Sequence, residues 1–244
     1  DRGAGNNEKY SITGGYGDLS KDRFNFLVSV DKEKSDAVAA SQRSFAKTGL
    51  RDDLDQVKTS GNAYPANIRS GSGRGNPTAA TGCLPAKGSY FIAAQSNRNC
   101  RYDYTAALEI YPPIERQGAV ARATFQLNAD TQLFGEYTYT KNKATYASSE
   151  TPINDFSAAG DRPIIFPASS KWYPGPFRRP DGSLATPVGD LAIAWRGKDA
   201  GRRTDEAVSE QSRIVVGIKG NLGSWDYDSA FNHAESKVTD SYTD

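Results

Sequence analysis

Alternation of apolar and polar residues constrains this chain most, because strict alternation predicts β-strands with one apolar face. The alternating segments come in three pairs, each joined by a short polar turn, in residues 9–32, 117–142 and 212–235. In the second pair, every second residue from Ala119 to Leu127 is apolar. The sequence therefore predicts an all-β chain with three antiparallel hairpins, which contain about six strands.

The register of the second hairpin follows from keeping its apolar residues on one side of the sheet, because a slip of one residue would turn all of them over. A three-residue turn at residues 128–130 meets this condition. It sets Arg122 opposite Glu136 on the polar face and Phe125 opposite Leu133 on the apolar face.

The same condition predicts a four-residue turn at residues 221–224 in the third hairpin. Lys219 is then expected opposite Asp226, on the polar face. Ile218 is expected opposite Tyr227, on the apolar face.

Two long segments rich in Gly, Pro, Ser and Asn separate the hairpins, at about 36–116 and 146–209. Such loops are uncommon in compact domains, whereas short turns alternating with long loops are typical of outer-membrane barrels. No stretch approaches the roughly 20 apolar residues of a membrane helix. The pattern favours strands of a transmembrane β-barrel with long extracellular loops. The alternative is a soluble β-sandwich, in which the apolar face packs on a second sheet.

The two cysteines, Cys83 and Cys100, lie in one polar segment of the first long loop. An even pair in such a loop suits a disulfide formed in an oxidising compartment. Two free thiols are the alternative. A second pair of metal ligands is missing from their surroundings, so the sequence predicts no metal site there.

Charge and motifs argue against several function classes. The 30 basic and 29 acidic residues nearly balance and form no dense basic run, which argues against nucleic-acid binding. His233 is the only histidine, and no G-x-S-x-G motif accompanies it. The sequence therefore predicts a protein that is not an enzyme and that uses no cofactor.

The strongest candidate for ligand contact is residues 163–182, where aromatic residues alternate with prolines and cations. Prolines stiffen a loop, and aromatic faces beside guanidinium groups can hold a sugar or an anionic chelate. The candidate ligand-binding residues are Trp172, Tyr173, Phe177, Arg178, Arg179 and Trp195. Alternatively, the aromatic side chains form a small core of the loop itself.

Three stretches resemble the barrel of TonB-dependent outer-membrane receptors, and the resemblance is closest to the large proteobacterial receptors with long outer loops. They are GGYGDLSKDRFNFLVSVD (14–31), ERQGAVARATFQLNADTQLFGEYTYTKN (115–142) and RIVVGIKGNLGSWDYDSAFNHAES (213–236). Together the three stretches cover about a third of the chain. The plug domain of that family and its TonB-contacting segment are not in this chain, and six strands fall short of the family's barrel of about 22.

The resemblance implies that residues 1–244 are the early part of one longer barrel in the outer membrane of a Gram-negative bacterium. It implies TonB-coupled uptake of a metal chelate, cobalamin or an oligosaccharide. The expected partners are the lipid bilayer, the remaining barrel strands, the plug, the TonB complex and a small nutrient. The alternatives are a passive channel or structural barrel, and a soluble all-β binding or adhesion domain.

Overall fold

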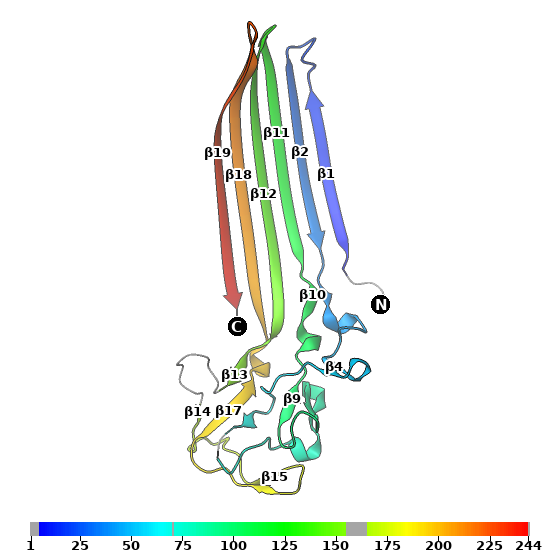
Figure 1. Ribbon diagram of the computed structural model, residues 1–244, viewed down its shortest axis with the longest axis vertical. Helices are drawn as coiled ribbons and strands as arrows, with labels where there is room; N and C mark the ends of the chain where they lie inside the picture. Colours follow the sequence, from blue (N-terminus) through cyan, green and yellow to red (C-terminus); the bar gives the residue numbers. More distant parts are fainter. Residues whose placement is uncertain (1–4, 70, 155–164, 244) are drawn as a thin grey trace.

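The computed structural model describes residues 5–69, 71–154 and 165–243. Six long antiparallel strands form one sheet, and the irregular parts of the chain gather at one end of it (Figure 1). In sheet order, the strands are β1 (Asn7–Tyr16), β2 (Phe24–Ser35), β11 (Ile114–Asn128), β12 (Thr131–Glu150), β18 (Arg202–Leu222) and β19 (Trp225–Thr243). The all-β class and the three predicted hairpins are confirmed.

The described residues between the hairpins form short elements. Their strands are β3 (Val38–Ala39), β4 (Leu50–Arg51), β5 (Gln56–Val57), β6 (Asn67–Ile68), β7 (Cys83–Leu84), β8 (Ser89–Phe91), β9 (Cys100–Tyr102), β10 (Glu109–Tyr111), β13 (Pro152–Asn154), β14 (Ile165–Phe166), β15 (Phe177–Arg178), β16 (Leu184–Ala185) and β17 (Leu191–Arg196). Single 3-10 turns are η1 (Ala40–Gln42), η2 (Asp52–Leu54), η3 (Ala79–Thr81), η4 (Pro85–Lys87), η5 (Thr105–Ala107) and η6 (Lys198–Ala200). Among the described residues, no helix is long and apolar enough to span a membrane.

The central strands are longer than the alternation predicted. β12 and β18 stay paired as far as Ala147 and Thr204, and Glu150 pairs with Arg202 beyond an irregularity. The backbone ladder continues there because its hydrogen bonds do not depend on side-chain alternation. The loops therefore span 36–113 and 151–201 instead of 36–116 and 146–209, and residues 155–164 of the second loop lie outside the described part.

The second hairpin has the predicted register. Arg122 lies opposite Glu136, and Phe125 lies opposite Leu133. Only the turn differs, because Asn128 pairs with Thr131 next to a register irregularity, which makes the turn shorter than the three residues expected.

The register predicted for the third hairpin is wrong by two residues. Lys219 pairs with Asp228, not Asp226, and Tyr227 faces Gly220 in place of Ile218. Leu222 and Trp225 also pair, so the turn contains the two residues 223 and 224, where four were expected. Gly223 has a φ of 64°, a conformation that two-residue hairpin turns favour for glycine. A shift of two residues preserves which side chains share a face, so the predicted apolar and polar sets remain correct.

The sheet is open. β1 and β19 are its two edge strands, and no described strand joins them to close a barrel. The structure therefore shows an open antiparallel sheet, which is the coarser part of the predicted architecture.

The described parts of the two loops fold together into one body at the end of the sheet, here called the loop module (residues 36–69, 71–113, 151–154 and 165–201). β6 of the first loop pairs with β17 of the second. Ile68, Leu191 and Ile193 form one buried cluster of the module, and a second cluster surrounds Cys83 and Cys100. Most of the buried hydrophobic side chains in the described chain therefore lie in the loop module, whereas the sheet is largely exposed.

Candidate functional site

One face of the sheet carries apolar side chains from all six strands, a feature here called the apolar band. The cross-strand register aligns these side chains in rows. One row contains Tyr16, Phe26, Ala123, Gly135, Val216 and Phe231. The next row toward the loops contains Gly14, Val28, Ala121, Tyr137, Ile214 and His233. The third row is apolar at Ile12, Val30, Ala119 and Tyr139, and it is already polar at Ser212 and Glu235 on β18 and β19.

The apolar band is exposed in the described structure. The exposed fractions of Ile12, Val216 and Phe231 are 74%, 54% and 69%. Its aromatic side chains contact one another, as in the Phe26–Phe125 pair with ring centroids 5.3 Å apart. A contiguous apolar patch of this kind marks a surface that meets lipid or another protein.

Charged residues follow the apolar band on the loop side of the same face. Lys141 Nζ lies 2.5 Å from Glu210 Oε1, and Lys143 Nζ lies 2.7 Å from Glu206 Oε2. The change from apolar to charged residues therefore occurs at a similar level on neighbouring strands.

The opposite face of the sheet is predominantly polar. Arg122 Nε lies 3.3 Å from Glu136 Oε1, and Arg213 Nε donates to Asn232 Oδ1 at 2.7 Å. Because facing side chains on this side pair with one another, this face suits contact with water or polar protein groups.

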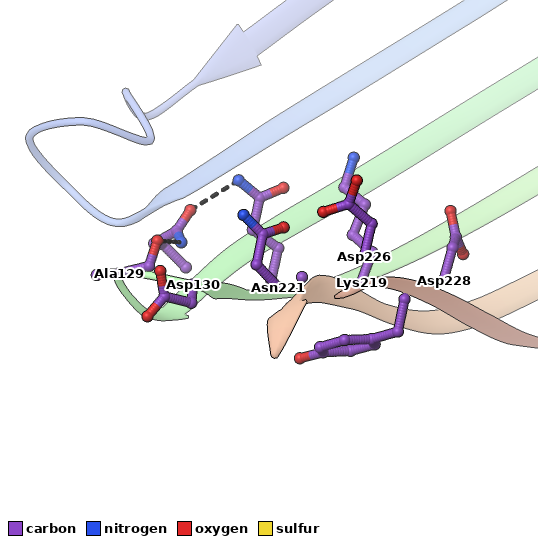
Figure 2. Close-up of a pocket in the computed structure, with 10 residues that line it drawn as sticks. Ala129, Asp130, Lys219, Asn221, Asp226 and Asp228 are labelled. Atoms are coloured by element: carbon purple, nitrogen blue, oxygen red, sulfur yellow. Dashed lines mark hydrogen bonds between the residues drawn. The ribbon is translucent and has the colours of Figure 1, made fainter. Parts of the chain in front are cut away.

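A polar pocket of about 520 Å³ lies at the turn end of this sheet. Figure 2 shows Lys219, Asp226 and Asp228 along its side, with Asp130 and Asn221 nearer the turns. The pocket is open and polar, and it is not the ligand site that the sequence predicted.

The sequence-predicted ligand residues lie in the second half of the loop module. The side chains of Tyr173, Phe177 and Trp195 pack against the cluster formed by Ile68, Leu191 and Ile193. The Tyr173 hydroxyl also donates to the carbonyl of Gly189 at 2.7 Å. These three aromatic residues therefore contribute to the loop's own core, which was the alternative interpretation of their pattern.

The two arginines differ in what they contact. Arg179 joins the two loops, because its guanidinium donates to the carbonyls of Arg74 and Ser72 at 2.9 and 2.7 Å. Arg178 is exposed and donates to the carbonyl of Gly182, four residues away.

Trp172 is the most exposed of the predicted aromatic ligand residues, with 75% of its surface accessible. Lys171 Nζ lies 5.2 Å from the centre of its ring. Trp172 and Arg178 are therefore the predicted residues that remain most accessible to a ligand.

A buried cluster that the sequence analysis missed joins the loop module to the end of β12. The Tyr102 hydroxyl donates to Glu150 Oε2 at 2.7 Å, and Lys198 Nζ donates to Glu150 Oε1 at 3.1 Å. The guanidinium of Arg196 stacks on the Tyr102 ring at 4.9 Å. Because these residues lie in separate segments of the chain, local sequence patterns give no sign of their proximity.

The protonation of this cluster follows from its contacts. Burial alone would raise the pKa of Glu150, but the hydrogen bond from Tyr102, a backbone hydrogen bond and the hydrogen bond and charge of Lys198 together outweigh burial and hold that pKa below its ordinary value. Burial of Tyr102 and its hydrogen bond to Glu150 raise the pKa of the phenol. Glu150 is therefore an anion at neutral pH that connects β12 to both loops.

The predicted disulfide is confirmed. Cys83 and Cys100 are bonded to each other within the buried cluster of the first loop. Closing a loop with a sequence separation of 17 stabilises the folded chain by on the order of 3 kcal/mol in the chain-entropy view.

No protein-family model, curated protein or solved structure matches the chain. Within the described residues, no group of three or more His, Cys, Asp or Glu side chains could hold a metal ion. The function is therefore inferred from the apolar band, the polar face and the loop module.

Proposed function

We propose that this chain is part of the barrel of a TonB-dependent outer-membrane receptor that takes up a small nutrient. The observation that carries the proposal is the apolar band. It continues across six strands and gives way to charged residues on the loop side. The band's height, the polar face behind it and the arrangement of loops and turns support the proposal in different ways.

The height of the apolar band suits a bilayer. From Phe24 to Val30 on β2 and from Leu127 to Ala119 on β11, the apolar positions span about 20 and 26 Å at 3.3 Å per residue. Outer-membrane barrels have an apolar band roughly 25 Å tall. Because barrel strands are tilted by roughly 35–45°, these lengths correspond to about 15–20 Å across the membrane, which is most of that height.

The polar face supports a barrel over a soluble sandwich. A sandwich would cover the apolar band with a second sheet, but no described strand lies over the exposed Val216 and Phe231. Lipid can cover this face, while Arg122 and Glu136 on the other face line a water-filled or protein-filled interior.

The two open edges indicate that more strands complete the sheet. The edge strands β1 and β19 present backbone groups that hydrocarbon cannot satisfy. We infer that further strands of a longer chain pair with both edges, as the resemblance to barrels of about 22 strands implies.

The folded loop module favours a receptor over a passive channel or structural barrel. Its loops have buried cores and a disulfide, so they can hold a binding surface in place. Trp172 and Arg178 are the accessible candidates for contact with a sugar or an anionic chelate. The coupling to TonB through a plug rests on the resemblance.

Spin labels on neighbouring residues of β19 test the membrane-embedded sheet. In the full-length receptor in lipid vesicles, we expect a label at Phe231→Cys to collide mainly with lipid-soluble oxygen. A label at Asn232→Cys, on the other face, should be less accessible to oxygen from the lipid. Equal access of a water-soluble nickel chelate to both labels would contradict a membrane-embedded sheet and support a soluble domain.

Nutrient uptake by whole cells separates the receptor from a passive channel. Collapse of the inner-membrane proton gradient should abolish energy-coupled uptake of the transported compound. Uptake that continues unchanged would contradict TonB coupling and support a passive channel.

A further inference from the structure

We infer that a shallow groove at the loop-side end of the apolar band binds one phosphate-bearing anionic lipid, with an acyl chain in the groove and the phosphate at Lys32. This inference rests on the proposed membrane position of the sheet and adds a specific partner to it. The groove has a volume of about 450 Å³. Its lining on the band side includes Tyr10, Ile12, Val30, Lys32, Ala119 and Tyr139.

The shape of the groove follows from the register of three strands. Ala119 pairs with Val30 on one side and with Tyr139 on the other, so a small side chain lies between two larger ones. Ala121 repeats this arrangement one row closer to the turns, between Val28 and Tyr137. Small residues therefore recur along β11 on the turn side of the groove, in the direction in which an acyl chain lies in a bilayer.

Charge at one end of the groove selects the headgroup. Lys32 lies two residues past Val30 on the same face, and its partners in register are the uncharged Tyr10 and Gln117. Its apolar stem can lie along the groove while its ammonium reaches the headgroup level.

Lys32 differs from the other lysines of this face. Lys141 is paired with Glu210, and Lys34 lies in register between Glu8 and Glu115. Among the described residues, no carboxylate is positioned directly opposite Lys32 in the register, so its charge can pair with a lipid phosphate.

The position of the groove at the edge of the apolar band favours a lipid over a soluble ligand. Its apolar part adjoins the residues expected in hydrocarbon, and its charged end adjoins the row where the face becomes polar. A lipid with an anionic phosphate matches both ends at once, because attraction to basic side chains adds to burial of the chain.

Native mass spectrometry of the full-length protein in detergent tests this inference with two probes. Dioleoylphosphatidylglycerol and dioleoylphosphatidylcholine have the same acyl chains and differ in net headgroup charge. We expect the protein to retain one phosphatidylglycerol in preference to phosphatidylcholine. Lys32→Gln should lower retention of phosphatidylglycerol about fivefold, the value expected for one cation near an anionic lipid, and should leave phosphatidylcholine unchanged.

Two matched controls separate this site from general effects. Lys237→Gln removes a lysine from the same row on β19, where it lies opposite Glu210, and should not change retention. Ala119→Phe fills the groove and should reduce retention of both lipids, whereas Ser229→Phe, on the same face of β19, should not. Equal retention of both lipids by the wild type, or identical effects of Lys32→Gln and Lys237→Gln, would overturn the inference.

Flotation with lipid vesicles distinguishes failure of the groove from failure of the proposed function. A protein that inserts into vesicles but shows no preference for phosphatidylglycerol contradicts only the lipid site. A protein that does not insert contradicts the membrane position on which the lipid site depends.

Discussion

Arg122 and Glu136 face each other across β11 and β12 with 3.3 Å between Nε and Oε1, on the side of the sheet opposite Phe125 and Leu133. An exposed ion pair of this kind contributes a few tenths of a kcal/mol to about 1 kcal/mol. The ion pair says more about the orientation of the sheet than about stability. If the two strands were turned over, the charged Arg122 and Glu136 would lie on the apolar band. The pair therefore identifies which side of the sheet faces away from lipid in the proposed barrel.

A charged substitution on the apolar band should block membrane assembly, whereas the same substitution on the neighbouring residue should not. Phe231→Arg places a cation on the band, at a cost of roughly 2–4 kcal/mol at mid-bilayer. Ala230→Arg is the matched control, because Ala230 is also exposed and belongs to the opposite face. The folded fraction in outer membranes, measured by heat-modifiable gel mobility, checks this prediction. Equal assembly of both variants would contradict the assigned faces.

A methyl group at Gly217 should destabilise the sheet more than one at Gly135. A Cβ at Gly217 would collide with the Phe134 ring and lie 2.8 Å from the backbone oxygen of Ser229, whereas a Cβ at Gly135 has only the carbonyl oxygen of Val215, at 3.9 Å. We expect Gly217→Ala to cost about 1–3 kcal/mol, the usual range for overpacking. Gly135→Ala should be close to neutral. Urea unfolding of the full-length protein in detergent micelles measures the difference, and equal midpoints for the two variants would show that Phe134 does not lie across Gly217.

The loop module should lose stability in acid because of Glu150. The pKa of Glu150 is lowered in the folded chain, so its contribution is complete above the ordinary value of 4.5 and is lost as the pH falls through the lower folded value. Glu150→Gln should lower the temperature at which a protease cuts the loops at pH 7. Below about pH 4.5, that temperature should fall less in the variant than in the wild type.

Asp53→Asn is the control for the acid effect. Asp53 is an exposed carboxylate of the same loop module, paired with Arg51 at 2.6 Å. Such surface pairs contribute little to stability. The temperature at which a protease cuts the loops of this variant should therefore match that of the wild type, both at pH 7 and below about pH 4.5. An acid transition that Glu150→Gln leaves unchanged would assign the transition to other carboxylates.

Loss of both Trp172 and Arg178 should weaken ligand binding without unfolding the loop module. Both side chains are exposed in the structure. Trp and Arg side chains that become buried when a ligand binds often dominate the binding energy. We therefore expect the double alanine variant to lower affinity for the transported compound about tenfold or more. Leu184→Ala changes an exposed residue of the same module and should leave affinity unchanged. Isothermal titration of the full-length receptor measures both. Unchanged affinity of the double variant would leave only a structural role for this part of the loop.

The face of each long strand could be predicted from the sequence, because side chains alternate along any extended chain. The same alternation places Phe125 opposite Leu133, which the structure confirms. It could not choose between Asp226 and Asp228 as the partner of Lys219, since both lie on the same face two residues apart. The register is set by the two-residue turn that begins at Gly223, with Leu222 and Trp225 paired on either side of it.

The loop module depended on tertiary structure, because its contacts join residues far apart in the chain. The fully buried Asn67 donates to the carbonyl of Cys100 and accepts from its backbone amide, at 2.8 and 2.9 Å. Trp195 packs in the core that the second loop shares with Ile68 of the first. Alternation along the strands determined which side chains lie together on each face of the sheet. Only the packing of one loop against the other decided which aromatic residues form the core and which remain free to meet a ligand.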